Sequence, residues 1–418
     1  MSTINFSSKI YSRVLILTNM VKIMIIRQLQ KEIEDKILSN EVSYQAADPI
    51  LKKKNAIIIY GARQVGKTTL VKQILEKYPN ESRYINCELI ANKTALETTD
   101  DKALQSYLGD KRIVILDEAQ KIKDIGLTLK IIVDTFPQYQ IIATGSSSFD
   151  LANKINEPLT GRAYRYMLYP VSLKELSTVH SLYSPAVLEN ILRYGLYPEV
   201  INKLYSESEE AAREKLDEIS SNYLYKDIFE IEHLKRSDII LKLLQALALQ
   251  VGNEVSTHEL ATLLKVNVAT VESYIYLLEQ SFVLFTLRSF SRNPRKELGK
   301  KYKVYFYDLG IRNSLIQNYN PVDLRTDIGA LWENFCILER IKYNHANKRL
   351  VNKYFWRTYA GQEIDYIEEH SGQLDGYEFK WGKETRKYTP PKKFIETYEN
   401  ATVKRIDRDN YSEFLLDY

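Results

Sequence analysis

The sequence has little cysteine and no long hydrophobic run. Cys87 and Cys336 are its only cysteines, and neither belongs to a CxxC pair or a Cys/His cluster. This argues against a disulfide framework or a zinc site, so we expect a reducing compartment and two small buried thiols. The most apolar stretch near the N-terminus, residues 14–26, is interrupted by Asn19 and Lys22 and is too short to span a bilayer.

The sequence also lacks a strong charge bias. Its 58 Lys and Arg residues against 54 Asp and Glu residues leave a formal net charge of +4, an ordinary value that does not by itself demand nucleic acid. The length of 418 residues favours about two to four domains, and 44% apolar residues allow a sizeable core. No small-residue cleavage site follows the N-terminal apolar run. We therefore expect a cytoplasmic protein without a membrane partner, folded from about Met24 onward.

The clearest chemical signal is an apolar run that leads into a glycine-rich loop and then a helical pattern. Residues 56–60 read AIIIY, a G-x-x-x-x-G-K-T loop follows, and residues 70–77 have helical character. Strand, loop and helix in this order form a P-loop, in which glycines turn N–H groups inward and the helix dipole favours phosphate. The alternative is a plain glycine turn before a helix. The predicted ATP site comprises Gly61, Ala62, Arg63, Gln64, Val65, Gly66, Lys67, Thr68 and Thr69, with Lys67 on the phosphates and Thr68 on Mg²⁺.

A second predicted strand carries an acidic pair. Residues 112–119 read RIVILDEA, an apolar run that ends in Asp117 and Glu118. A buried parallel strand would deliver these carboxylates to the sheet edge where nucleotides bind. We expect Asp117 to hold Mg²⁺ through its water shell and Glu118 to polarise the attacking water. Many strands end in this way, so the pattern gains its meaning from the P-loop upstream.

Two later segments resemble further parts of AAA+ ATPases. Residues 139–147 form a predicted strand with small hydroxyl residues at its end, similar to a sensor strand inserted between the two motif strands. Thr144 or Ser146 would then lie near the γ-phosphate or the lytic water, unless the segment is only a serine-rich turn. Arg162 precedes the last predicted core strand, where an arginine finger for a neighbouring subunit would stand. The alternative is a loop-stabilising arginine.

Together these segments resemble a prokaryotic AAA+ family whose C-terminal half carries the DUF4143 region. Residues 169–172 (YPVS), 195–199 (GLYPE) and 225–228 (YKDI) make the likeness specific, and it extends over about residues 24–418. The arginine finger implies a homo-oligomeric ring, of which a hexamer is one form. The expected domains are an N-terminal segment with a lead-in helix (1–50), the P-loop AAA+ ATPase core (51–170), a helical lid (171–250), a winged helix (251–290) and the DUF4143 domain (291–418).

The predicted winged helix has an unusual charge distribution. A capping box from Ser256 to Glu259 starts a short helix, and a second helix is predicted over residues 268–280. The second helix carries Glu272 and Glu279 but no Lys or Arg, so it is a poor DNA reader on its own and a protein contact is equally open. Basic residues gather instead around the wing, where they would track a phosphate backbone or form a solvated surface: Arg288, Arg292, Arg295, Lys296, Lys300, Lys301 and Lys303.

The last segment resembles the PD-(D/E)xK nuclease core. Glu333 falls on a predicted helix over residues 327–343, Asp365 on a strand, and Glu378 and Lys380 on one face of the next strand. The resemblance implies that Glu333, Asp365 and Glu378 bind Mg²⁺ and that Lys380 orients or deprotonates the attacking water. Ile364 stands where that core usually has proline. Because a fold can persist after its activity is lost, cutting remains one of two readings.

The sequence therefore predicts an α/β protein with a P-loop AAA+ core, a helical lid, a winged helix-turn-helix and a nuclease-like C-terminal domain. We expect it to hydrolyse ATP with Mg²⁺ and to couple hydrolysis to the binding, translocation or processing of branched or broken DNA. The alternative is a nucleotide-dependent switch or protein-remodelling ATPase whose nuclease-like domain is an inactive binding platform. A partner-triggered defence ATPase is a third option.

Overall fold

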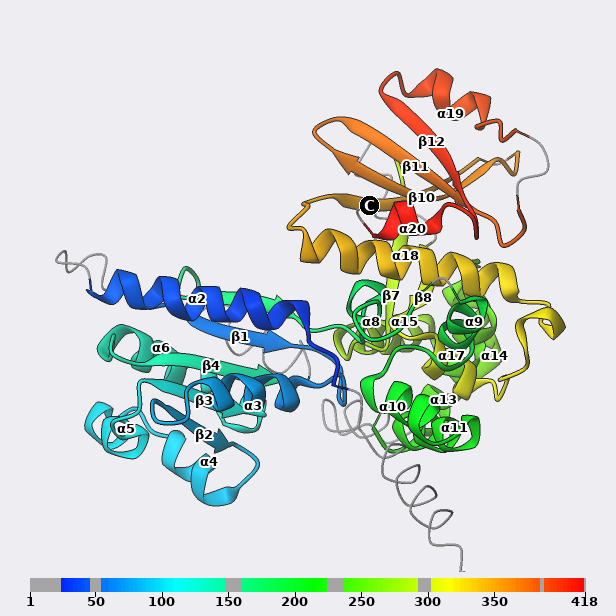
Figure 1. Cartoon of the computed structure of the whole chain (residues 1–418). Coiled ribbons are helices and arrows are strands. Elements are labelled where there is room, and N and C mark those ends of the chain that lie inside the picture. Colours follow the sequence, from blue (N-terminus) through cyan, green and yellow to red (C-terminus); the bar gives the residue numbers. More distant parts are fainter. Residues whose placement is uncertain are drawn as a thin grey trace, which may run out of the picture.

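Two sheets organise the chain, one near each end (Figure 1). The computed structural model describes residues 24–45, 54–146, 159–182, 184–223, 237–291, 302–358, 360–383 and 387–416. The first sheet is parallel, with strand order β2-β3-β4-β1-β5. Its strands are β1 (Ala56–Tyr60), β2 (Ser82–Asn86), β3 (Ile113–Asp117), β4 (Gln140–Gly145) and β5 (Ala163–Met167).

The central strands of this sheet are continuous apolar runs because both of their faces are covered. Every residue of β1, β3 and β4 is buried, as is typical of parallel sheets packed between helices. The strand β4 lies between β1 and β3, which confirms the predicted insertion of the sensor-like strand. The helices of this part are α2 (Gln28–Gln45), α3 (Lys67–Lys77), α4 (Ile90–Leu96), α5 (Asp101–Leu108) and α6 (Ile125–Thr135), with the 3₁₀ turn η2 (Ala119–Lys121).

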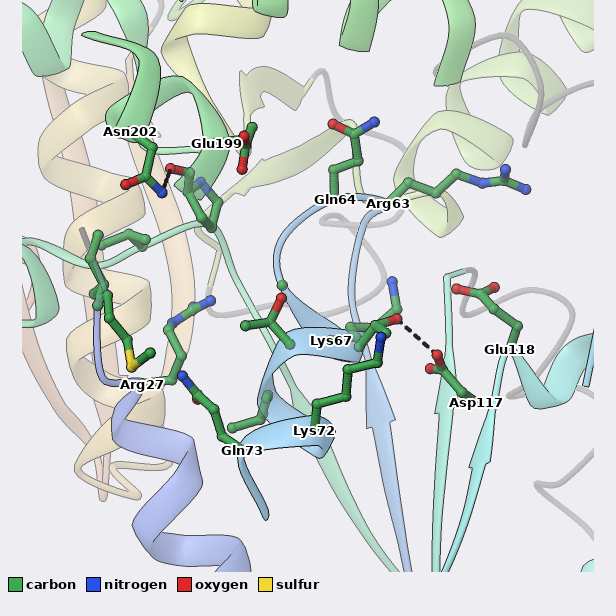
Figure 2. A pocket seen from close by; sticks show the side chains of 18 of the residues that line it. Arg27, Arg63, Gln64, Lys67, Lys72, Gln73, Asp117, Glu118, Glu199 and Asn202 are labelled. Atoms are coloured by element: carbon green, nitrogen blue, oxygen red, sulfur yellow. Dashed lines mark hydrogen bonds between the residues drawn. The ribbon is translucent and has the colours of Figure 1, made fainter. Parts of the chain in front are cut away.

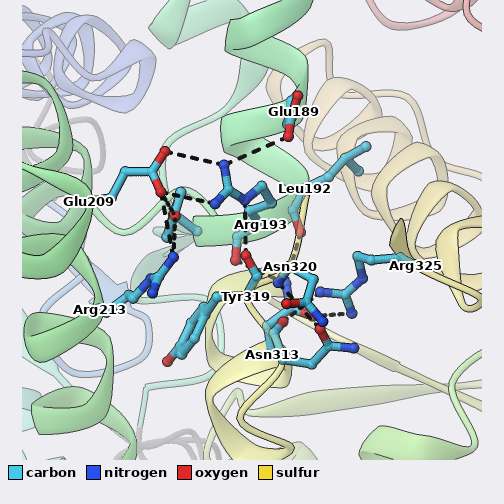
Figure 3. A network of polar contacts seen from close by, with 11 residues as sticks. Glu189, Leu192, Arg193, Glu209, Arg213, Asn313, Tyr319, Asn320 and Arg325 are labelled. Atoms are coloured by element: carbon cyan, nitrogen blue, oxygen red, sulfur yellow. Dashed lines mark hydrogen bonds and ion pairs between the residues drawn. The ribbon is translucent and has the colours of Figure 1, made fainter. Parts of the chain in front are cut away.

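A helical region follows the first sheet. Its elements are α8 (Leu173–Leu176), α9 (Pro185–Tyr194), α10 (Pro198–Ser206), α11 (Glu209–Glu218), the π-helical turn η3 (Ile219–Tyr223) and α13 (Ser237–Leu249). A polar network ties it to the C-terminal half (Figure 3). The Arg193 guanidinium of α9 donates to Glu209 Oε2 at 2.9 Å and to the Tyr319 carbonyl at 3.0 Å. Asn313 adds a 2.8 Å bond to the Leu192 carbonyl, so α9 is held on two sides.

The second sheet has seven strands in the order β12-β11-β10-β9-β7-β8-β6. They are β6 (Glu254–Val255), β7 (Leu284–Ser289), β8 (Tyr302–Phe306), β9 (Asn352–Arg357), β10 (Glu363–His370), β11 (Gln373–Phe379) and β12 (Ala401–Ile406). The parallel pairing of β7 with β9 makes one sheet out of strands on both sides of the expected domain boundary at residue 290. The accompanying helices are α14 (Thr257–Leu264), α15 (Val268–Gln280), α17 (Leu309–Leu315), α18 (Ile328–Ala346), α19 (Lys392–Thr397) and α20 (Tyr411–Leu415), with the 3₁₀ turn η4 (Val322–Leu324).

Helix α18 connects the two halves. It lies between the C-terminal strands and the helical region (Figure 1), and its residues Trp332, Phe335 and Ile337 are buried. Both cysteines are buried and unpaired, as predicted. The N-terminal residues 1–23 and the family segment at residues 225–228, both interpreted from the sequence, lie outside the described residues. Among the helices that the structure describes, none combines the length and apolar character needed to span a bilayer.

Candidate functional site

A large cavity opens at the carboxyl ends of β1 and β3. Its volume is about 850 Å³, and the loop after β1 forms one wall while the segment before α2 and helices α10 and α11 form the other. Figure 2 shows Arg27, Glu199 and Asn202 on one side, Asp117 and Glu118 on the other, and Lys67 between them. Such a cavity is large enough for a nucleotide.

The loop after β1 requires glycine at two positions for different reasons. A Cβ atom on Gly61 would lie only 2.3 Å from the Leu168 carbonyl oxygen, so a side chain there would displace backbone. Gly66 has φ of 99°, in the left-handed region, and immediately precedes α3. The N–H groups in the first turn of a helix have no acceptor within the helix, so the loop presents donors to the cavity.

Lys67 is buried within this loop. Its Nζ donates to the carbonyl oxygens of Gly61 at 2.8 Å and Ala62 at 2.9 Å, and the residue is only 4% exposed. A buried ammonium needs compensating acceptors, which the loop carbonyls supply here. The lysine that sequence analysis assigned to phosphate binding is therefore held at the cavity floor. Arg63, Gln64, Thr68 and Thr69, also predicted, line the same cavity.

Asp117 is the centre of a hydrogen-bond cluster at the end of β3. Its Oδ2 accepts from the hydroxyls of Thr68 at 2.9 Å and Tyr84 at 2.6 Å, and its Oδ1 accepts from Thr144 at 2.5 Å. Burial and the hydrogen bond to Asp117 raise the pKa of Tyr84. Thr68 and Asp117, the two residues predicted to hold Mg²⁺ at the nucleotide site, are thus in direct contact.

Thr144 lies near the end of β4, beside the acidic pair. It is fully buried, and its hydroxyl donates to Asp117 and accepts from the Glu118 N–H at 3.1 Å. Both hydroxyl functions are therefore engaged with the acidic pair. Thr144 therefore contacts the acidic pair directly, and its expected place near the γ-phosphate or the lytic water stays a prediction.

Glu118 projects into the cavity from a left-handed backbone conformation. Its φ is 56°, which is uncommon for a residue other than glycine. Its carboxylate accepts from Gln120 Nε2 at 2.5 Å, and Gln120 also donates to Ser146 Oγ at 3.0 Å. Gln120 and Ser146 thereby join the acidic pair to the end of β4. Sequence analysis missed Gln120 and Tyr84 because neither lies in a motif.

The far wall of the cavity was also missed by sequence analysis. Glu199, Asn202 and Lys215 reach it from α10 and α11, far along the chain from the P-loop. Arg27 supports the P-loop from behind, since its Nη1 donates to the Val65 carbonyl at 2.7 Å. Its other nitrogens bond the Tyr169 carbonyl at 2.6 Å and pair with Glu175 at 3.1 Å. One arginine thus joins the N-terminal segment, the P-loop and the segment after β5.

Arg162 lies at the opposite edge of the sheet. It precedes β5, and Ala163 pairs with Ala56 at the amino end of β1, whereas the P-loop follows the carboxyl end. A five-residue strand spans roughly 17 Å at about 3.3 Å per residue, so Arg162 and the P-loop are separated by the length of the strands. Arg162 Nε pairs with Asp134 Oδ1 at 2.7 Å on the surface. It is too far away to act on the nucleotide cavity of its own chain.

The C-terminal carboxylates come together as the strand pattern predicts. The β10–β11 register pairs Tyr366 with Tyr377, which sets Asp365 opposite Glu378. Lys380 Nζ pairs with Glu378 Oε1 at 2.6 Å. Burial opposes the charge of Lys380, but the hydrogen bond to Glu378 and the charge of Asp365 outweigh burial and raise the pKa of Lys380 above its ordinary value.

Glu333 and Asp365 accept hydrogen bonds from protein groups, whereas Glu378 Oε2 is buried without a hydrogen-bond partner among the described residues. Glu333 Oε1 accepts from Lys303 at 3.1 Å and from the Tyr305 hydroxyl at 2.5 Å, while Asp365 accepts from the Phe379 N–H at 2.8 Å. Burial and repulsion from Asp365 raise the pKa of Glu333 to about 7. In the described part of the chain, no three Asp, Glu, His or Cys side chains are grouped as metal ligands. The assignment of Glu333, Asp365 and Glu378 to Mg²⁺ therefore does not fit the side chains as they lie.

The predicted basic wing is only partly described. Arg288 is exposed on β7, as a phosphate contact requires, but Lys303 is buried and ion-paired and must be removed from the cluster. The other five members, in residues 292–301, lie outside the described residues.

Buried polar contacts join the nucleotide cavity to the C-terminal half. Asp308, at the end of β8, accepts from the Leu196 N–H at 2.6 Å in the loop that precedes α10. A Cβ on Gly195 would lie 2.1 Å from Asp308 Oδ1, so this contact explains the glycine. On α18, Lys342 donates to the carbonyl of Val171, a residue that lines the cavity, at 2.9 Å.

Three known family patterns match successive parts of the chain. The sequence patterns of an AAA domain, a domain of unknown function (DUF8612) and a second one (DUF4143) match residues 53–177, 186–321 and 328–409. An uncharacterized protein of Mycobacterium tuberculosis is 28% identical over 336 residues, which cover 79% of this chain and 71% of that protein. One of Methanocaldococcus jannaschii is 23% identical, with coverage of 96% and 93%.

Among solved structures, similar chains are P-loop ATPases. A Walker-type ATPase of Pyrococcus abyssi aligns with a TM-score of 0.47 and 16% identity, covering 70% of this chain and 96% of that one. The RuvB Holliday junction branch migration motor of Thermotoga maritima aligns with a TM-score of 0.28 and 19% identity, covering 63% and 90%. The AAA-domain match and the geometry of the P-loop together identify an AAA-type ATPase core in the N-terminal half.

Proposed function

We propose that the protein binds Mg²⁺–ATP in the cavity after β1 and hydrolyses it. The observation that carries this proposal is the direct contact of Thr68 with Asp117 beside the buried Lys67. Residues 61–69 present backbone N–H groups to the phosphates, and Lys67 exchanges its loop carbonyls for phosphate oxygens. Thr68 and Asp117 hold Mg²⁺, which neutralises charge on the phosphates. Glu118 accepts a proton from the attacking water, oriented by Gln120 and by Thr144 beneath it.

We further propose that ATP hydrolysis is coupled to DNA. The order β6, α14, α15, β7, β8, with β6 antiparallel to β8 and β8 antiparallel to β7, supports a winged helix that begins at about residue 251 and extends beyond residue 290 to the end of β8. Arg288 on β7 and the basic residues at 292–301 supply its phosphate contacts. The helical region over residues 171–250 acts as the lid, since α10 and α11 line the nucleotide cavity. The nuclease-like region over residues 291–418 adds a second DNA-binding surface.

The test is the steady-state ATPase rate of the full chain with no nucleic acid, duplex, single-stranded and four-way-junction DNA. We expect at least one form to raise the rate, with an effect that weakens as salt rises. If no form binds or changes the rate at moderate salt, the DNA proposal is wrong. The second candidate, a switch or remodelling ATPase, would then stand. It is favoured by the buried links from the cavity to α18 and by the absence of Lys and Arg from α15.

We also propose that Arg162 acts on the nucleotide of a neighbouring subunit in a ring. Its position at the amino end of β5 keeps it from its own cavity, and its partner Asp134 is on the surface. A fixed positive charge brought to the γ-phosphate from outside stabilises the transition state by roughly 10³- to 10⁵-fold in related ATPases and GTPases. An active site would therefore be complete only after assembly.

Arg162→Ala is expected to bind ATP normally and to lose assembly-dependent hydrolysis. Lys67→Ala keeps Arg162 but has no working cavity, so mixing the two inactive variants should restore part of the activity. Steady-state phosphate release from the mixture measures this. Lys130→Ala, which replaces a half-buried lysine on α6, serves as the mixing control in place of Arg162→Ala. A mixture as inactive as its components, at concentrations where the chains associate, contradicts the proposal.

A further inference from the structure

A buried lysine pairs with two carboxylates of the C-terminal cluster. Lys303 lies on β8 and its side chain is 2% exposed. Its Nζ is 3.1 Å from Glu333 Oε1 on α18 and 2.5 Å from Glu363 Oε1 on β10. Burying an ammonium costs free energy unless it is paired and hydrogen-bonded, so these two contacts are needed to keep the Lys303 side chain buried. Sequence analysis placed this lysine in a solvent-facing wing.

Two carboxylates hold the Lys303 ammonium in place. Those of Glu333 and Glu363 lie within ion-pair distance of Nζ and come from two different elements, α18 and β10. The ring of Phe355 lies 5.4 Å from Nζ and gives the ammonium a further favourable contact. Two carboxylates of the cluster, those of Glu333 and Glu363, are therefore already paired with a cation that belongs to the chain.

The surroundings leave the carboxylates poorly placed for a metal ion. Glu333 Oε1 accepts hydrogen bonds from both Lys303 and the Tyr305 hydroxyl. Glu333 Oε2 faces Gly252, and a Cβ atom on that glycine would lie 3.2 Å from this oxygen. Mg²⁺ demands near-octahedral oxygen ligands at about 2.0–2.1 Å, and the Lys303 ammonium already engages Glu333 Oε1, one of the oxygens that it would need. No metal-ligand group is present among the residues described, in agreement with this.

We propose that the Lys303 ammonium takes the place of the divalent metal in this nuclease-like centre, which is therefore metal-free and does not cut DNA. The same ion pairs give the lysine a structural use. They join β8 to α18 and β10, and so fix the strands before residue 306 against the C-terminal strands. The inference is independent of the ATPase proposal, because its test requires no nucleotide.

The test is Mn²⁺ binding to the nucleotide-free full chain, followed by electron paramagnetic resonance and by thermal unfolding. The Glu333→Gln variant should bind the same amount of Mn²⁺ as the wild type. Lys303→Met removes the cation and leaves the carboxylates, so this variant should gain one Mn²⁺ per chain, bound at least about tenfold more tightly than any Mn²⁺ in the wild type. Mn²⁺ should also raise its unfolding temperature selectively, because it binds the folded state.

Lys342→Met is the matched control. Lys342 is also buried on α18, with 3% of its side chain exposed, but it pairs with one carboxylate, Glu339. Its removal should destabilise the chain without creating a metal site. Any P-loop Mn²⁺ is common to all variants and cancels in the comparison.

Two results would overturn the inference. The first is that the wild type binds Mn²⁺ and that Glu333→Gln or Asp365→Asn loses this bound ion. The centre would then hold a metal ion beside Lys303. The other is a folded Lys303→Met chain that gains no more Mn²⁺ than Lys342→Met. Should Lys303→Met fail to fold, the comparison of wild type with Glu333→Gln still decides, because the amide keeps the size of the Glu333 side chain and its oxygen can still accept a hydrogen bond from the Tyr305 hydroxyl.

Discussion

Lys67→Ala is expected to weaken ATP binding by roughly 30- to 5,000-fold, the effect of truncating one partner of a buried charge pair that contributes about 2–5 kcal/mol. Lys67 is 4% exposed and held by two loop carbonyls, so its charge meets the phosphates in a site that excludes most water. The loss should therefore appear in affinity as well as in hydrolysis. Equilibrium binding of a fluorescent ATP analogue, with and without Mg²⁺, measures it.

Lys77→Ala is the matched control for this prediction. Lys77 ends the same helix, but it is exposed and pairs with Glu34 on the surface. Its truncation should change stability by less than about 1 kcal/mol and leave ATP affinity unchanged. Normal affinity in Lys67→Ala, with the chain folded, would mean that the phosphates lie elsewhere than in the loop of residues 61–69.

Glu118→Gln is expected to bind Mg²⁺–ATP and to hydrolyse it roughly 10²- to 10⁴-fold more slowly, the usual contribution of a positioned general base. The amide keeps the size of the side chain and its contact with Gln120, but it cannot accept a proton from water. Binding should be retained because Lys67, Thr68 and Asp117 are untouched. Single-turnover hydrolysis of labelled ATP, together with affinity measured in parallel, separates the two effects.

Glu76→Gln provides a charge-matched control, since Glu76 is exposed on α3. It should hydrolyse ATP at the wild-type rate. Wild-type turnover in Glu118→Gln would show that another group takes the proton, and the role of Glu118 would have to be abandoned. A loss of ATP affinity equal to the loss of rate would instead place Glu118 in ground-state binding.

The nucleotide site was predictable because its signals are local. The strand β1, the loop and α3 are contiguous, and the apolar run of β3 fixes where Asp117 and Glu118 emerge. The far wall was not predictable in this way. Arg27, Glu199 and Asn202 reach the cavity from distant elements, and nothing in their own neighbourhoods distinguishes them from surface residues.

The C-terminal cluster shows the same limit more sharply. Strand alternation correctly set Asp365 against Glu378, because register is a local property of a hairpin. The burial of Lys303 depends instead on α18, which begins about 25 residues later, and on β10 beyond it. From the sequence, a lysine in a basic stretch is expected at the surface. A buried cation was the feature that changed the interpretation of the site.

The central claim is that the cavity after β1 hydrolyses ATP, and its most direct test is a single-turnover measurement on the wild-type chain. Excess protein is mixed with γ-labelled ATP, with and without Mg²⁺ and duplex DNA, and bound ATP and released phosphate are followed over time. The structure predicts that bound ATP is converted to ADP and phosphate only when Mg²⁺ is present, faster with DNA. ATP that remains bound and intact in the presence of both Mg²⁺ and DNA would contradict the account.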